Sequence, residues 1–232
     1  DGPLQGYFLF PFQEQRGGTP AADGRKEITF RLSIDLDPTL SEQQKEELRT
    51  ALKAWVAFGG VGARTRRGCG ALKAIGPNAQ EWLVPNEQDQ IRAWLTRLIP
   101  NASEQREPAV KPSLVGARIL FVLNNGDAMD IWSKLGRFWA RFRKGHFKVD
   151  YQPMRGAKWD DYRKVLCKLS SQSEVLKLAK PYLGLPIIYQ EFRGANRPCF
   201  TGTIEPSNSG RMASPVILKP VALTGGKVGG IV

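Results

Sequence analysis

The chain has 232 residues, and 41% of them are apolar, which is enough hydrophobic material for one large folded domain or two small ones. Its 34 basic residues outnumber its 22 acidic ones, and the net charge of +12 favours a phosphate-rich partner over an acidic one. A single histidine excludes two-histidine metal sites and paired-histidine ribonuclease chemistry within the chain, and three widely spaced cysteines indicate neither a disulfide framework nor a zinc ribbon. We therefore expect no cofactor and no metal site.

Membrane insertion and secretion are not indicated either. No apolar run approaches the roughly 20 residues that a membrane helix needs, and the N-terminus lacks the basic, apolar and small-residue order of a signal peptide. We expect a cytoplasmic protein with no membrane partner.

The N-terminal region contains two predicted strands. Residues 28–36 alternate between apolar and polar side chains, which is typical of a strand with one buried face. Residues 6–12 are aromatic and are followed by a polar, Gly-rich stretch over 13–25, so we expect the two segments to pair as a hairpin with a long loop.

A helix and a short strand are predicted next. Ser41 and Gln44 have the spacing of a capping box. The apolar residues that follow it share one helical face, and they are Leu48, Leu52, Trp55 and Val56. The pattern predicts a helix over residues 42–57, then a glycine-rich loop, then a short strand over 71–75.

The remaining elements follow in the same way. Residues 91–99 have a helical apolar face, and residues 114–123 form a hydrophobic strand. Asp127 or Asp130 would cap a further helix. The aromatic and aliphatic stripe of that helix, which we expect in the core, consists of Ile131, Leu135, Phe138, Trp139 and Phe142. Segments 183–189 and 211–220 predict short strands that could pair, and residues 225–232 predict a hairpin.

This order of elements predicts an α+β protein built from ferredoxin-like (RRM-like) units in two domains. Residues 1–78 would be the latter part of a first, N-terminally incomplete domain that carries the glycine-rich loop. Residues 79–232 would form a second ferredoxin-like domain with a basic helical insertion.

The glycine-rich loop is the first candidate site for a polyanion. Glycines let a ligand approach the main chain, successive amides can bind an anion, and arginines match the geometry of phosphate. The candidate RNA-binding residues of the loop are Gly60, Gly62, Arg64, Arg66, Arg67, Gly68 and Gly70. The alternative is an ordinary turn with solvated arginines, and any single arginine could instead be bound within the fold.

A basic helix is the second candidate site. Between Ile131 and Lys168 there are eleven Lys or Arg residues against three Asp residues. Its candidate RNA-binding residues are Arg137, Arg141, Arg143 and Lys144. The alternative is that these cations are only solvated.

The loop has the GxGxxxxxGxG spacing of the RAMP superfamily of CRISPR proteins, and the chain resembles members of that family. The wider stretch over residues 55–72 is similar to the first subunits of type III-B Cmr effector complexes. Residues 184–187 and 211–220 resemble, in the same order, the C-terminal motifs of those subunits, and Arg211 in the second stretch is a further candidate RNA-binding residue.

The resemblance implies a non-catalytic RNA-binding subunit of an antiviral ribonucleoprotein, with two ferredoxin-like domains. Its expected partners are the guide CRISPR RNA near its 3′ side, the target RNA and the other Cmr-complex subunits. The arginine-rich N-terminal helix of those subunits is absent from this sequence, and Cys69 stands where they usually have an aromatic residue.

Three other interpretations remain open. A RAMP endoribonuclease that processes CRISPR RNA would use His146 as its acid or base, although no second acid-base partner is evident. A nucleotide-binding P-loop is disfavoured, because this loop follows a helix and lacks the Gly-Lys-Ser/Thr ending. The loop and the basic helix could also serve contacts with neighbouring subunits.

Overall fold

The computed structural model of the chain describes residues 8–9, 12–14, 20–99, 114–144, 161, 177–189, 202–208 and 210–232. It divides into two compact units, one made of Asp1–Gly136 with Ile217–Val232 and the other of Arg137–Val216. The predicted domain boundary after residue 78 is a different division of the chain and stays a prediction. In the described parts, no helix combines the length and the hydropathy that a membrane crossing requires.

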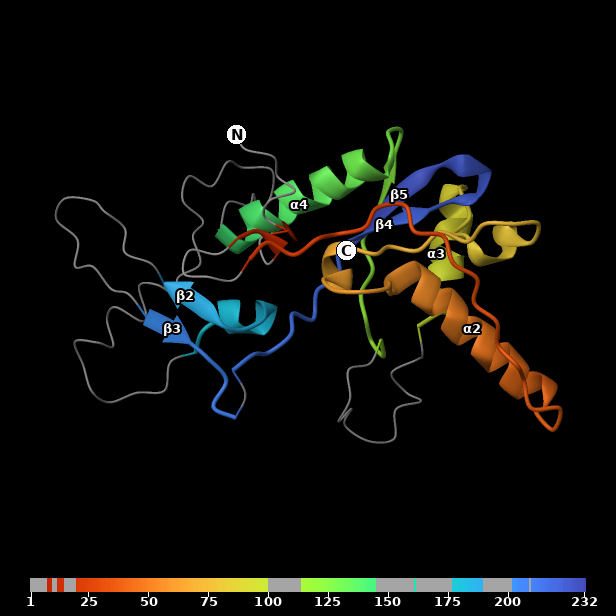
Figure 1. Cartoon of the computed structure of the whole chain (residues 1–232), viewed down its shortest axis with the longest axis horizontal. Helices are drawn as coiled ribbons and strands as arrows, with labels where there is room; N and C mark the ends of the chain where they lie inside the picture. Colours follow the sequence, from red (N-terminus) through yellow and green to blue (C-terminus); the bar gives the residue numbers. More distant parts are fainter. Residues whose placement is uncertain are drawn as a thin grey trace. The chain divides into compact units, whose positions relative to one another are not determined.

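The first unit combines helices with a three-stranded antiparallel sheet (Figure 1). The strand order is β1 (Phe121–Asn124), β5 (Val228–Ile231) and β4 (Lys219–Ala222). The helices whose bounds lie in the described part of this unit include α2 (Glu42–Phe58), α3 (Gln88–Arg97) and the first part of α4 (Ala128–Lys144), with short 3-10 turns at Thr65–Arg67, Ala79–Trp82 and Thr224–Gly226. Helices and sheet together make an α+β structure, whereas the ferredoxin-like unit stays a prediction.

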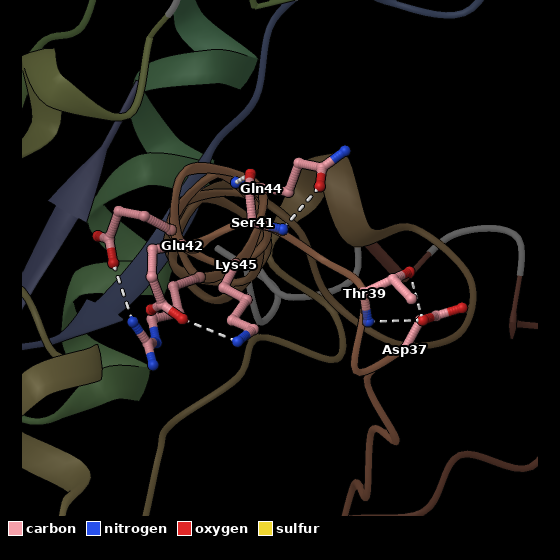
Figure 2. A network of polar contacts seen from close by, with 8 residues as sticks. Asp37, Thr39, Ser41, Glu42, Gln44 and Lys45 are labelled. Carbon is pink, nitrogen blue, oxygen red and sulfur yellow. Dashed lines mark hydrogen bonds and ion pairs between the residues drawn. The ribbon is translucent and has the colours of Figure 1, made fainter.

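Helix α2 begins at the predicted capping box. The Gln44 backbone N–H donates to Ser41 Oγ at 3.2 Å, and the Ser41 backbone N–H donates to Gln44 Oε1 at 2.9 Å (Figure 2). Just before it, Asp37 accepts hydrogen bonds from the hydroxyl and the backbone N–H of Thr39, which lower the pKa of this carboxyl. The predicted helix over 42–57 is therefore confirmed, and it extends one residue further, to Phe58.

One face of the sheet covers the main core. The core consists of Ala57, Phe58, Val84, Ile91, Leu95, Leu98, Val221, Leu223 and Ile231, so it joins the end of α2 to α3 and to strands β4 and β5. The helix predicted over 91–99 is confirmed as α3, which supplies Ile91 and Leu95 to this core, while Leu98 joins it from the C-cap position. Alternation along β4 places Lys219 on the same face as Val221.

Helix α4 packs on the opposite face of the sheet, and glycine in the central strand allows the close approach. A Cβ atom on Gly230 would lie 2.8 Å from Ile131 Cγ1 and 3.4 Å from Leu135 Cδ1. Since real Cβ atoms do not come that close to a carbon atom, a larger residue would push the helix away.

Helix α4 confirms the prediction for this segment and selects one of the two caps. Asp127 is the cap, because its Oδ1 accepts the Asp130 backbone N–H at 2.8 Å while Asp130 Oδ2 accepts the Asp127 N–H at 3.2 Å. The expected core stripe is only partly correct. Ile131, Leu135 and Trp139 are buried, whereas Phe138 is 44% exposed and Phe142 is half-buried.

The predicted strand over 28–36 is wrong for the structure described. This segment has no ladder partner, and its alternating apolar side chains are all exposed, namely Ile28, Phe30, Leu32, Ile34 and Leu36. A strand forms only when a neighbouring strand supplies hydrogen-bond partners for its backbone, so an alternation of apolar and polar residues is not sufficient by itself. The expected short strand over 71–75 is also irregular, and residues 8, 9 and 12 of the expected strand over 6–12 lie in helical turns.

The predictions for the strands of the three-stranded sheet agree more closely with the structure. The hairpin predicted over residues 225–232 is only partly correct, because β5 pairs with the preceding strand β4, so these residues supply the end of the turn and the second strand of the hairpin. The strand over 114–123 is confirmed at its end as β1, where Phe121 lies opposite Ile231.

The second unit contains its own two-stranded antiparallel sheet, made of β2 (Ile187–Tyr189) and β3 (Gly202–Ile204). The two stretches that were expected to pair meet only at a single bridge between Leu185 and Met212. A 3-10 turn at Lys180–Leu183 precedes β2, and the buried Asp161 carboxylate accepts the backbone N–H groups of Ala179 and Lys180 at 3.0 and 2.6 Å.

Candidate nucleic-acid interface

The glycine-rich loop over 59–70 lies directly after α2 and is closed by backbone contacts. The Val61 N–H donates to the Gly70 carbonyl at 3.0 Å, so the loop begins and ends at the same point. Gly70 has a φ of +64°, and a Cβ atom there would lie 1.8 Å from the Val61 carbonyl oxygen. Only glycine permits this closure.

The middle of the loop is attached to the rest of the first unit. The Leu218 N–H donates to the Arg66 carbonyl at 2.9 Å, and Trp132 Nε1 donates to the Arg67 carbonyl at 2.6 Å. At the start of the loop, Trp55 Nε1 donates to the Gly60 carbonyl at 3.4 Å. These contacts fix the backbone conformation of the loop.

The three arginines of the loop have different surroundings. Arg67 is buried, and its Nη1 donates to the Arg66 carbonyl at 3.0 Å. Arg64 adopts a left-handed backbone conformation, and its Nε donates to the Phe8 carbonyl at 3.0 Å. The half-buried Arg66 guanidinium has no hydrogen-bond or ion-pair partner among the residues that the structure describes. Arg66 is thus the arginine of this loop that is best placed to meet an external anion.

The outer part of the loop adds backbone donors. Gly62 and Ala63 are exposed, and within the described structure their N–H groups have no acceptor. Gly62 and Gly68 both have positive φ values, of +91° and +82°. The loop therefore offers exposed amides together with one unpaired guanidinium, which suits a phosphate oxygen.

Cys69 is not suited to nucleophilic chemistry. The thiol is half-buried, and burial raises its pKa, although the nearby positive charge of Arg64 acts in the opposite direction. A thiol with a raised pKa is protonated at neutral pH and is a poor nucleophile. No group of three or more metal-binding side chains is found in the described part of the chain.

Several residues that shape this site were missed by the sequence interpretation. The ring centroids of Trp132 and Phe8 lie 5.7 Å apart, with an angle of 33° between the rings, and each residue contacts the loop through a polar group, the indole N–H of Trp132 or the backbone carbonyl of Phe8. The Lys219 side chain is fully buried and donates to the Val56 carbonyl in the last turns of α2. Only long-range contacts identify these residues, so no local pattern could have revealed them.

An open hollow of about 1080 Å³ runs along α2, and Gly59 is part of its lining. Its lining includes Glu46 and Glu47, and Glu46 Oε2 already binds Arg49 Nη1 at 3.3 Å. Carboxylates at this position repel a phosphate chain, so the hollow is a poorer polyanion site than the loop.

The second candidate set lies on the last turns of α4, in the second unit. Arg137 and Arg141 are exposed and have no partner in the described residues. The half-buried Arg143 lies over the Trp139 ring at 6.0 Å from its centroid. Lys144 ends the helix, and its side chain lies outside the described residues, as does His146.

Positive charge also accumulates around Arg143. The pKa of Lys180 is lowered, first by burial and second by the positive charge of Arg143, while the Asp161 carboxylate opposes both. Arg211 is exposed near the bridge between Leu185 and Met212 and has interactions of its own. The loop residues lie together in the first unit, whereas Arg137, Arg141 and Arg143 follow one another on α4 in the second.

Comparison with known proteins gives one match. Residues 2–73 match the family model of the RAMP superfamily, and the matched part includes the whole of the loop over 59–70. The match supports a RAMP protein of CRISPR systems, although it covers less than half of the chain. No curated protein and no solved structure matches the chain.

Proposed function

We propose that this chain is a non-catalytic, RNA-binding RAMP subunit of a type III-B CRISPR effector complex. In this role it would lie near the 3′ side of the guide RNA, beside other Cmr-complex subunits, and help to capture target RNA. The observation that carries the proposal is that one closed loop contains both the exposed amides of Gly62 and Ala63 and the Arg66 guanidinium, which has no partner among the described residues. The RAMP match over the same segment supports RNA as the ligand.

The physical fit between loop and ligand is direct. An RNA strand is a line of phosphates, and a preformed loop can bind it with main-chain donors and a cation without reading its bases. The raised pKa of Cys69 supports a binding role over a covalent one.

The test compares two arginines that differ in whether they are paired. Arg66→Ala removes the unpaired loop cation, whereas Arg49→Ala removes an exposed cation of α2 that is already bound to Glu46. We expect Arg66→Ala to weaken binding of single-stranded RNA several-fold and to reduce the slope of log K against log salt by about 0.7, because one phosphate contact is lost. Arg49→Ala should leave both quantities near the wild-type values.

Equal behaviour of the two variants would contradict the proposal for the loop. The same preparations also test the absence of catalysis, because shortening of the labelled RNA by the wild-type protein, abolished by His146→Ala, would establish the endoribonuclease instead.

A further inference from the structure

The last turns of α4 carry an exposed aromatic side chain in a field of positive charge. Phe138 is 44% exposed, whereas Leu135 and Trp139 on the same helix are buried. It stacks on the half-buried Phe142, with ring centroids 5.9 Å apart and an angle of 18° between the rings.

Two arginines beside this pair, Arg137 and Arg141, have no ion-pair partner among the residues that the structure describes. Arg137 and Arg141 directly precede Phe138 and Phe142 in the helix, so the two arginines repeat at the same four-residue spacing as the two phenylalanines. Residues 131–144 contain no Asp or Glu, whereas exposed helix cations commonly pair with an acidic residue one turn away. Within the described residues, this part of α4 therefore combines an exposed aromatic side chain with two unpaired cations.

We infer that Phe138, with Phe142 behind it and with Arg137 and Arg141 beside it, is a stacking site for a base of single-stranded RNA. Bases have flat π faces that stack on aromatic rings, and arginines next to the rings bind the phosphates that link those bases. A duplex hides its base faces, so the site selects unpaired RNA. This inference rests on the proposed RNA-binding function and adds the chemical feature that the second site recognises.

The experiment separates stacking from bulk and charge. We would measure binding of the full chain and its variants to a short single-stranded RNA of mixed sequence, and to the same strand without its bases. Phe138→Leu removes the aromatic ring but keeps an apolar side chain, whereas Phe138→Tyr keeps the ring. Met129→Leu, at another exposed apolar position on the same helix, is the matched control.

Phe138→Leu should weaken binding of the base-containing strand by about fivefold or more, while Phe138→Tyr and Met129→Leu bind like the wild type. On the strand without bases, Phe138→Leu should equal the wild type. Arg137→Ala with Arg141→Ala should weaken binding of both strands and lower the salt slope by about 1.4.

Wild-type binding by Phe138→Leu, or an equal loss on both strands, would overturn the inference. So would a Phe138→Leu protein whose self-association or binding to a partner subunit changes while RNA binding does not. Loss of RNA binding by Arg66→Ala without any effect at Phe138 would remove only this inference and leave the proposed function intact. A wild-type chain that binds neither strand would remove both.

Discussion

Lys219 is a buried cation for which the described structure offers no carboxylate. Its side chain is 0% exposed, and burial lowers its pKa from 10.5 to about 7. Its ammonium group donates to the Val56 carbonyl, near the negative end of the α2 dipole. Lys219 thereby connects strand β4 to the end of the helix from which the glycine-rich loop departs.

This burial predicts a pH dependence of stability. Because the pKa of Lys219 is lower in the folded chain than in the unfolded one, the unfolded chain binds more protons between about pH 7 and about pH 10. Stability should therefore rise with pH across this window and fall as the pH drops towards 7, by an amount on the order of a few kcal/mol. Lys219→Met should lose this part of the dependence in urea unfolding at several pH values.

Lys73→Met is the matched control, because Lys73 is exposed. It should keep the wild-type slope of stability against pH. If Lys219→Met also kept that slope, Lys219 would be charged in the folded protein and its burial would be tolerated without a change in protonation.

At the loop, sequence reasoning could predict the presence of a closed, cationic turn but not the role of each arginine. The glycine spacing was informative because Gly70 must approach the Val61 carbonyl. The difference between the buried Arg67 and the unpaired Arg66 depends on Leu218 and Trp132, which lie far away in the sequence. Only the assembled fold brings those residues together.

Among the elements, α2 is the one whose beginning has a local cause. The capping box of Ser41 and Gln44 satisfies two backbone N–H groups at its N-terminus. Ser41→Ala should therefore lower the free energy of unfolding by about 1 kcal/mol, measured from urea midpoints. Ser33→Ala, in an exposed segment without secondary structure, is the control and should have little effect. Equal stability of the two variants would show that α2 does not depend on its cap.

The contrast between α2 and residues 28–36 shows why some elements could be predicted and others could not. A helix satisfies its own backbone, so caps and a period of 3.6 are local signals and α2, α3 and α4 could all be recognised. A strand needs a partner, and the alternation over 28–36 does not provide one. The central position of β5 was likewise not predictable, because it depends on pairing with β1, which lies about a hundred residues earlier.

On the scale of the whole molecule, the net charge of +12 predicts strongly salt-dependent RNA binding. If Arg66, Arg137 and Arg141 each neutralise one phosphate, the slope of log K against log salt is about −2, which corresponds to a roughly tenfold to twentyfold loss of affinity for a fourfold rise in salt. Titrations of single-stranded RNA at several KCl concentrations measure this slope. A flat plot would show that the excess charge serves solubility and not RNA binding.

The mixed α+β class could also be inferred from the order of elements, and both strands and helices are present. The division of the chain could not, because the first unit is completed by residues 217–232 from the other end of the chain. The packing of residues 217–232 into the first unit depends on contacts between segments that are distant in the sequence. Local sequence patterns do not reveal such contacts.

The attachment of the loop by Leu218, Trp132 and the Val61–Gly70 contact has a kinetic and entropic consequence. A loop that is already in its bound conformation loses little conformational entropy when a ligand binds, so the RNA strand must make most of the conformational adjustment. Capture at this loop should then depend more on how readily the nucleic acid bends than on any rearrangement of the protein.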